Sequence, residues 1–335
     1  MPFPKKHSFL ISNAAEQACA KMNLLGSMRV PFVFVIDYEM KQPIVLPLDE
    51  LENAGIFYQI DGIGNLSSQT EVAYKPIAFE KHPVDFETYR KAFNRVKKHL
   101  QKGNSFLVNL TQSTPIKTNL SLLDIFCRSQ SNYNLYVQDK FVVFSPESFV
   151  KIKKRIIYSH PMKGTIPERV NDAENLILNS RKELAEHATI VDLIRNDLSV
   201  FSKNVTVNRF RYIDRIQTNK GGLLQVSSEI CGNLPVDYQD QIGNLLFSML
   251  PAGSVTGAPK LQTLQIISES ETHERGYYTG IFGIFDGENL DSAVMIRFIE
   301  KTESGLVFKS GGGITALSDA QTEYQEMIDK VYLPF

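Results

Sequence analysis

The stretch FVVFSPESFVKIKKRIIYSH, residues 141–160, decides the fold. It holds three short apolar runs, FVVF (141–144), SFVKI (148–152) and RIIYSH (155–160), rich in β-branched and aromatic side chains. Too few residues separate the runs for the long crossover that parallel neighbours need. We therefore predict three consecutive antiparallel strands, with the last two joined as a hairpin across residues 153–155.

Helical and strand-like patterns continue on both sides of this hairpin. Helices are predicted at 8–27, 84–103, 173–195 and 238–249, and a last helix follows Ser318, which has Gln321 in capping-box spacing. Further strands are predicted at 30–36, 105–114, 208–216, 223–232, 280–287, 292–300 and 305–310. Helices alternate with runs of adjacent strands rather than with single strands. This order predicts an α+β fold with large antiparallel sheets instead of a Rossmann-type fold.

The composition narrows the range of partners. The 335 residues carry a net charge of −1, which gives no overall attraction to nucleic acid or to an anionic membrane. Three scattered cysteines suggest neither disulfides nor a zinc site, and no apolar run reaches membrane-spanning length. The first residues lack the apolar core of a signal peptide. We expect a cytoplasmic protein whose partners are small molecules or another protein.

A lysine inside HPMKGTIP, residues 160–167, is a candidate nucleophile. Extending the predicted hairpin puts Glu147 opposite Pro161, two positions from Lys163. A neutral lysine amine at pH 7 costs roughly 4–5 kcal/mol unless its surroundings lower the pKa. Glu147 would need a pKa raised toward about 6–7 to act as a general acid. The alternative is a surface ion pair, which contributes little.

Two helices carry paired glutamates. Glu183 and Glu186 lie three residues apart on a face that Ile190 continues, and Glu323 and Glu326 repeat this spacing near the C-terminus. Carboxylates that are half buried need cations, and oxygen-only ligation suits Mg²⁺. Ordinary decoration of helix surfaces is the alternative.

Several segments offer donors for anions. Arg297 lies within the apolar run SAVMIRFIE, where either a protein carboxylate or a substrate carboxylate would have to meet it. The glycine run 311–313 lets backbone N–H groups approach an anion, although flexible turns are also glycine-rich. Ser254 in PAGSVTGAPK and Tyr278 in RGYYTGIFG are further candidates. Together these features predict a small, polyanionic substrate that carries carboxylates.

The segments PMKGTIP, EHATIVDLIRNDL, PAGSVTGAPK, RGYYTGIFG, AVMIRF and GGGI…SDAQTEYQE occur in the order seen in chorismate-utilizing enzymes. The chain resembles this family from about residue 84 onward. The resemblance implies an N-terminal segment, 1–83, that completes the fold, and a chorismate-binding catalytic domain, 84–335. It also implies that two large antiparallel sheets flank the site.

The same resemblance implies roles for individual residues. Glu186 and Glu326 are expected to bind Mg²⁺ directly, and Glu183 and Glu323 partly through water. Positions expected to hold chorismate are Gly164, Thr165, Ser254, Tyr278, Arg297, Gly311, Gly312, Gly313 and Lys330.

Within the family, Lys163 resembles the lysine of aminodeoxychorismate synthases, as does Glu147, sixteen residues earlier in an SPE turn. Anthranilate-forming members typically carry alanine at this position. Isochorismate- and salicylate-forming members use a lysine base where this chain has Leu107. The implied activity is conversion of chorismate, with ammonia from a glutamine amidotransferase partner, to 4-amino-4-deoxychorismate. Alternatives are an anthranilate synthase component and an inactive homologue that serves as a binding subunit.

Overall fold

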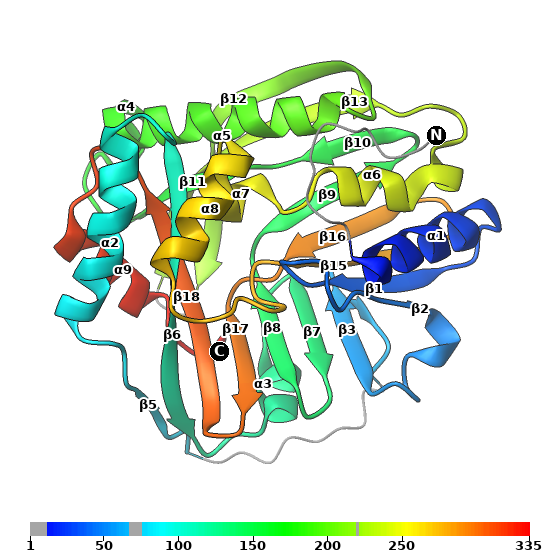
Figure 1. Cartoon of the computed structure of the whole chain (residues 1–335), viewed down its shortest axis with the longest axis horizontal. Coiled ribbons are helices and arrows are strands. Elements are labelled where there is room, and N and C mark those ends of the chain that lie inside the picture. The colour runs from blue at the N-terminus through cyan, green and yellow to red at the C-terminus, as the bar shows by residue number, and fades with distance from the viewer. Residues whose placement is uncertain (1–11, 67–75, 219–220) are drawn as a thin grey trace.

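Two antiparallel β-sheets packed together form the centre of the molecule. The order of helices and strands predicted large antiparallel sheets, and the family resemblance implied that there are two. The computed structural model describes residues 12–66, 76–218 and 221–335. Within these residues each sheet has nine strands, and all of the recorded strand pairs are antiparallel. Helices cover the outer faces of the sheets (Figure 1).

Sheet A combines the first two strands of the chain with strands from its middle and C-terminal parts. Its strands are β1 (Phe32–Ile36), β2 (Ile44–Pro47), β9 (Ser148–Lys153), β10 (Ile156–Ser159), β11 (Met162–Pro167), β12 (Lys203–Thr218), β13 (Gly221–Asn233), β15 (Ile281–Phe285) and β16 (Leu290–Val294). Their order is β11-β13-β10-β9-β16-β15-β1-β2, and β12 pairs with β13.

Sheet B contains the long strand pair that carries the glycine run. Its strands are β3 (Ile56–Ile60), β4 (Ile63–Gly64), β5 (Phe79–Lys81), β6 (Leu107–Thr118), β7 (Tyr133–Val137), β8 (Phe141–Ser145), β14 (Gly257–Ala258), β17 (Phe298–Thr302) and β18 (Gly305–Ile314). Their order is β14-β6-β18-β17-β8-β7-β3-β4, and β5 pairs with β6.

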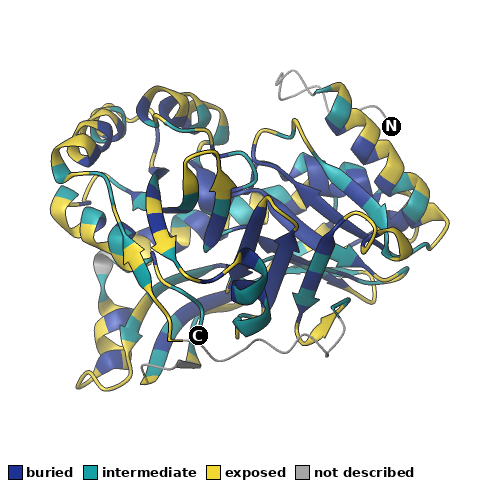
Figure 2. Cartoon of the chain, turned by 90° about the horizontal axis from the view of Figure 1, so that it is seen from below, coloured by how far each residue is buried: buried dark blue, intermediate teal, exposed yellow. Residues whose placement is uncertain are grey.

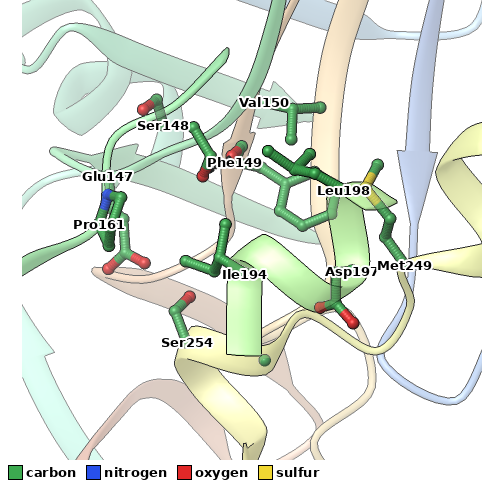
Figure 3. A pocket seen from close by; sticks show the side chains of 12 residues that line it. Glu147, Ser148, Phe149, Val150, Pro161, Ile194, Asp197, Leu198, Met249 and Ser254 are labelled. Atoms are coloured by element: carbon green, nitrogen blue, oxygen red, sulfur yellow. Dashed lines mark hydrogen bonds between the residues drawn. The ribbon is translucent and has the colours of Figure 1, made fainter. Parts of the chain in front are cut away.

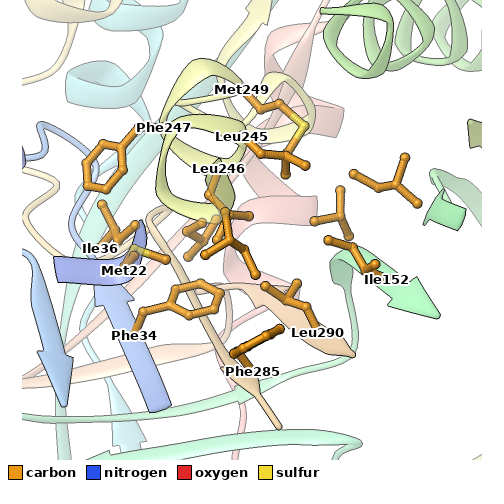
Figure 4. Close-up of a cluster of buried hydrophobic side chains, with 14 of the residues drawn as sticks. Met22, Phe34, Ile36, Ile152, Leu245, Leu246, Phe247, Met249, Phe285 and Leu290 are labelled. Atoms are coloured by element: carbon orange, nitrogen blue, oxygen red, sulfur yellow. The ribbon is translucent and has the colours of Figure 1, made fainter. Parts of the chain in front are cut away.

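The helices pack against the sheets through clusters of buried apolar side chains. They are α1 (Asn13–Ser27), α2 (Phe86–Gln101), α3 (Leu122–Arg128), α4 (Ala173–Asn179), α5 (Arg181–Ser199), α6 (Ile242–Ser248), α7 (Gly253–Thr256), α8 (Lys260–Ser270) and α9 (Ala320–Asp329), with short 3-10 helices at Leu48–Glu50 and Tyr238–Gln241. One cluster packs α1, α5 and α6 on sheet A (Figure 4). A second packs α2, α8 and α9 on sheet B, and a third fills the space between the sheets. Figure 2 shows this buried surface concentrated on the central strands.

Local sequence explains why α2 forms where it was predicted. The Asp85 side chain accepts a hydrogen bond from the Thr88 N–H group at the N-terminus. Tyr89, Phe93, Val96 and Leu100 recur at helical spacing and are all buried. Gly103, with φ of 75°, ends the helix in the left-handed conformation that glycine adopts most easily.

The predicted hairpin exists, but its register was wrong by one position. Ile157 faces Ile152 and Tyr158 faces Lys151, because the turn contains only Lys154 and Arg155. Both turn residues have positive φ, as a two-residue hairpin turn of this twist requires. The pairing also does not extend to Glu147, since β11 pairs with β13 instead.

Three predicted boundaries were wrong as well. The helix predicted at 173–195 breaks at Ser180, whose side chain caps α5 by accepting a hydrogen bond from the Glu183 N–H group. Asp319, not Ser318, caps α9. The strand predicted at 292–300 is two strands in different sheets, and Arg297 lies between them with φ of 54°. The start of the helix predicted at 8–27 falls partly outside the described residues, and the described helix begins at Asn13.

Candidate active site

Two chain crossings between the sheets form the floor of the site. The chain leaves sheet B after β8 and enters sheet A at β9, with Glu147 at the crossing. It returns from sheet A to sheet B between β16 and β17, with Arg297 at that crossing. Backbone hydrogen bonds join the two crossings, from Val294 N to Glu147 O at 3.1 Å and from Phe144 N to Arg297 O at 3.1 Å. The sheet junction therefore brings a carboxylate and a guanidinium together from segments about 150 residues apart.

Glu147 lies in surroundings that favour its protonated form. Removal from water raises the pKa of its carboxyl group above the ordinary value, and this is the dominant effect. Groups that oppose the rise by stabilising the carboxylate are a hydrogen bond from Ser254 and the cations Lys163, Arg297 and Lys330. A raised pKa is what a general acid working near neutral pH requires.

A small cavity adjoins this carboxyl group. Its lining includes Glu147, Pro161, Ser254 and, at the far end, Asp197 and Met249. Figure 3 shows the side chains of Glu147 and Ser254 at the same end of the cavity. The cavity volume of about 20 Å³ is enough for a single water molecule.

Lys163 points from β11 toward the glycine run of β18. A Cβ atom placed on Gly313 would lie 3.3 Å from the Lys163 Nζ atom and 2.9 Å from a methyl carbon of Leu107. Glycine at this position therefore leaves room for the amine. Lys163 also influences Glu147 and Lys330 electrostatically, so the amine lies near the candidate acid, although not through the hairpin pairing from which the sequence argument started.

Two more glycines lie against the predicted metal-binding carboxylates. Gly164, with φ of 80°, would place a Cβ atom 2.9 Å from a carboxylate oxygen of Glu183. A Cβ atom on Gly312 would lie 3.6 Å from Glu323 and 3.8 Å from Glu326. A Cβ atom at position 164 would therefore crowd Glu183, whereas one at position 312 would touch Glu323 and Glu326 at ordinary contact distance.

Lys330 binds the same region of β18. Its Nζ atom donates to the carbonyl oxygen of Gly311 at 2.8 Å and forms an ion pair with Glu326 at 2.7 Å. Removal from water lowers the pKa of the Lys330 amine, with the attraction of Glu326 opposing this effect. An amine held between a carbonyl and a carboxylate can also donate to an incoming substrate anion.

The carboxylates suit Mg²⁺ in chemistry. Glu186 is 8% exposed and Glu323 only 4%, and buried carboxylates call for a cation. Among the described residues, no three His, Cys, Asp or Glu side chains stand close enough to hold a metal by themselves. Mg²⁺ does not require such a cage, because it usually binds one or two carboxylates, waters and oxygens of an anionic ligand. An all-oxygen donor set therefore fits this ion.

Arg297 has no carboxylate partner within the described part of the chain. Its Nε atom donates to the Tyr332 hydroxyl oxygen at 3.1 Å, and its guanidinium lies 5.5 Å from the centre of that ring. Of the two predicted partners, a protein carboxylate is therefore not found for Arg297 among the described residues. Tyr332 was not identified from the sequence, since an isolated tyrosine near a C-terminus carries no recognisable pattern.

The remaining predicted residues differ in their exposure. Tyr278 is buried, and burial raises the pKa of its hydroxyl group. Thr165 is exposed on β11, where it pairs with Gln225 of β13. His187 is buried beside the predicted ligand Glu186, and its Nε2 atom lies 2.6 Å from the Ser228 hydroxyl oxygen. Burial lowers the pKa of His187 to about 4, so the imidazole is neutral at pH 7.

Comparison with known proteins identifies the family to which the chain belongs. The family model described as chorismate binding enzyme matches residues 25–334. The chain belongs to this family. The match begins within the predicted N-terminal segment, and the division of the chain at residue 83 stays a prediction. None of the described helices has the length and apolar character needed to cross a membrane.

Relatives of this chorismate-binding enzyme carry different names. An uncharacterized PabA-like protein of Pasteurella multocida is 52% identical over 93% of this chain and 96% of its own length. Aminodeoxychorismate synthase component 1 of Bacillus subtilis is 30% identical over 75% of this chain, but only 55% of its own length is matched. The crystal structure of anthranilate synthase component I from Streptococcus pneumoniae has a TM-score of 0.65 at 27% identity, covering 78% of this chain and 60% of that chain.

Proposed function

We propose that this chain converts chorismate and ammonia to 4-amino-4-deoxychorismate, the reaction of aminodeoxychorismate synthase component I in para-aminobenzoate and folate biosynthesis. The observation that carries the proposal is that Lys163 lies close enough to Glu147 to stabilise its carboxylate electrostatically. The Lys163 amine lies against Gly313, and the raised pKa of Glu147 keeps a proton available. A nucleophile and a general acid that can reach the same substrate are what displacement of an allylic hydroxyl needs.

The first step forms a covalent bond to the enzyme. The neutral Lys163 amine bonds to C2 of chorismate, the conjugated double bonds shift, and the C4–O bond breaks. Glu147 gives its proton to the departing hydroxyl, which leaves as water. Leu107, an apolar side chain beside Gly313, supports this assignment, because activation of water at C2 would require a base there.

The second step releases the product. Ammonia forms the C4–N bond, the double bonds shift back, and the bond between C2 and Lys163 breaks. The proton lost by the new amine returns to Glu147, so chorismate and ammonia give 4-amino-4-deoxychorismate and water. The enolpyruvyl group stays attached, and a separate lyase would have to remove it.

Binding residues hold the substrate through its carboxylates. Arg297 offers the two terminal nitrogens of its guanidinium, and Lys330 adds the amine that contacts the Gly311 carbonyl oxygen of β18. Glu183, Glu186, Glu323 and Glu326 are the residues that would hold Mg²⁺. The ion, when bound, would neutralise a substrate carboxylate and fix its orientation. We propose that a glutamine amidotransferase subunit supplies the ammonia.

Product analysis tests the proposed reaction. The purified chain is incubated with chorismate, Mg²⁺ and ammonium, and the products are identified by mass spectrometry, with an ammonium-free reaction as control. We expect a product that contains one new nitrogen and keeps the enolpyruvyl group. Anthranilate together with free pyruvate would reject the proposal in favour of anthranilate synthesis. Absence of any chorismate consumption, even with an amidotransferase present, would indicate a binding subunit.

A further inference from the structure

A buried ion pair lies directly behind the candidate site. The side chains of Glu271 and Arg275 are only 3% and 2% exposed. Arg275 meets both oxygens of the carboxylate, from NH2 at 2.7 Å and from Nε at 2.9 Å. A two-pronged contact of this kind fixes the plane and direction of both groups.

The remaining bonds of the pair reach the backbone of the substrate-binding elements. Arg275 NH1 donates to the carbonyl oxygen of Val255 at 2.9 Å, the residue after Ser254 in α7. Arg275 NH2 donates to the carbonyl oxygen of Asn109 at 2.7 Å, and Glu271 accepts from the Thr111 N–H group at 2.8 Å. In the register of β6 and β18, Asn109 faces Gly313 and Thr111 faces Gly311. The pair thus holds α7 and the strand partner of the glycine run together.

The same arginine also fixes the loop that carries Tyr278. The Tyr278 N–H group donates to the carbonyl oxygen of Arg275 at 3.1 Å. The next residue, Thr279, has φ of 63°, a strained conformation for a β-branched side chain. Such strain persists only when surrounding contacts enforce it, and here Arg275 NH1 donates to the Thr279 hydroxyl oxygen at 3.4 Å.

Stability alone does not explain this arrangement. Removing two charges from water is costly, and well-packed apolar residues often stabilise a protein as well as a buried ion pair does. What apolar residues do not provide is a set of directed bonds to three separate segments. We propose that the Glu271–Arg275 ion pair is a positioning element that sets the relative placement of Ser254, Tyr278 and the Gly311–Gly313 segment, and thereby the affinity for chorismate. This inference rests on the proposed role of those residues in substrate binding.

Glu271→Asp tests the inference, because it keeps both charges but draws the arginine back by the length of one methylene. A misplacement of roughly 1 Å can cost on the order of 100-fold when it reaches a site. We expect chorismate affinity, measured by titration calorimetry, to fall at least tenfold, with a melting temperature close to that of the wild type. Asp291→Glu is the matched control, since Asp291 pairs with Lys151 at 3.0 Å and Tyr133, outside the candidate site.

Thr111→Val provides a second measurement if Glu271→Asp does not fold. It removes the hydroxyl that donates to Glu271 at 2.9 Å and keeps the backbone bond, so a smaller loss of affinity is expected. Unchanged chorismate affinity in the folded variants, with only a lower melting temperature, would overturn the positioning role. Calorimetry measures chorismate binding regardless of which product is made. An unexpected product would therefore reject the proposed reaction but would not bear on the positioning role of the Glu271–Arg275 ion pair.

Discussion

At the scale of single residues, burying the Glu147 carboxyl group lowers the stability of the folded protein at neutral pH. Burial removes the carboxyl group from water, and its pKa is raised from the ordinary value of 4.5. Protonation therefore favours the folded state. The stabilising effect of the bound proton is complete below pH 4.5 and is lost as pH rises through the raised folded-state pKa. Each unit of difference between the folded-state and unfolded-state pKa changes the free energy of unfolding by about 1.4 kcal/mol.

Glu147→Gln should consequently be more stable than the wild type at pH 8, because the amide carries no charge to desolvate. The gain should shrink as the pH falls through the raised folded-state pKa of Glu147 and should be smallest below pH 4.5. Thermal unfolding at pH 4 and pH 8 measures both effects. Asp139→Asn serves as control, since Asp139 is a solvent-exposed partner of Lys301. A Gln variant that is less stable than the wild type at pH 8 would contradict the raised pKa.

Most candidate site residues were predictable because their motifs are short and continuous. Lys163, Gly164 and the glycine run are recognisable without knowing what they touch. The partners of Arg297 were not predictable, since Tyr332 approaches from another segment of the chain. The Glu271–Arg275 pair was missed because its four-residue spacing also occurs in ordinary surface ion pairs.

At the scale of elements, α9 is held in place from the N-terminal segment. Its residues Glu323 and Glu326 face Gly312. The Lys81 amine, at the end of β5, donates to the carbonyl oxygens of Ile328 at 2.7 Å and Val331 at 3.2 Å. A cation at a helix C-terminus satisfies otherwise unpaired carbonyl groups and complements the helix dipole.

Lys81→Met should destabilise the C-terminal end of α9 by about 1–2 kcal/mol, because partly buried charge–dipole contacts reach that range. Hydrogen exchange of the α9 amides measures the local effect, and the free energy of unfolding measures the total. Lys301→Met removes an exposed ion pair and should change neither by more than about 0.5 kcal/mol. Unaltered exchange in α9 would show that Lys81 does not hold the helix.

Element types were easier to predict than element ends. Apolar periodicity identified α2 correctly, but it continues across Ser180, where the chain breaks one predicted helix into α4 and α5. Periodicity likewise runs through Arg297, although the chain changes sheets there. In both places tertiary contacts decide the structure, and the local sequence pattern does not depend on these contacts.

At the scale of the whole molecule, the layer between the two sheets supports the crossings that carry Glu147 and Arg297. This layer contains Phe282 of β15, in sheet A, packed with Phe298 of β17, in sheet B. Both are at most 1% exposed. Loss of packing there would separate the sheets that form the floor of the site.

Phe282→Ala should lower the free energy of unfolding by about 3–5 kcal/mol, the usual cost of removing a fully buried phenylalanine. Denaturant unfolding followed by circular dichroism provides the measurement. Ile63→Ala is a suitable comparison, because Ile63 is 71% exposed and should change stability by no more than about 0.5 kcal/mol. Equal effects of the two substitutions would show that the layer between the sheets contributes little.

Fold class followed from the sequence because adjacent strand patterns leave few other ways to pair. The order of strands within each sheet did not follow. β1 lies between β15 and β2, so its main partner comes about 250 residues later in the chain. Pairings between distant segments depend on the packing of the whole molecule and leave no local pattern.

The most direct test of the proposed chemistry asks whether Lys163 becomes covalently bound to the substrate. The protein is incubated with chorismate and Mg²⁺ without ammonia, and the peptide that contains Lys163 is analysed by mass spectrometry. We expect it to gain the mass of chorismate less one water, and we expect Lys163→Ala to show no adduct and an ammonia-dependent rate lower by orders of magnitude. An Ala variant that makes product at the wild-type rate would contradict a nucleophilic role for this amine.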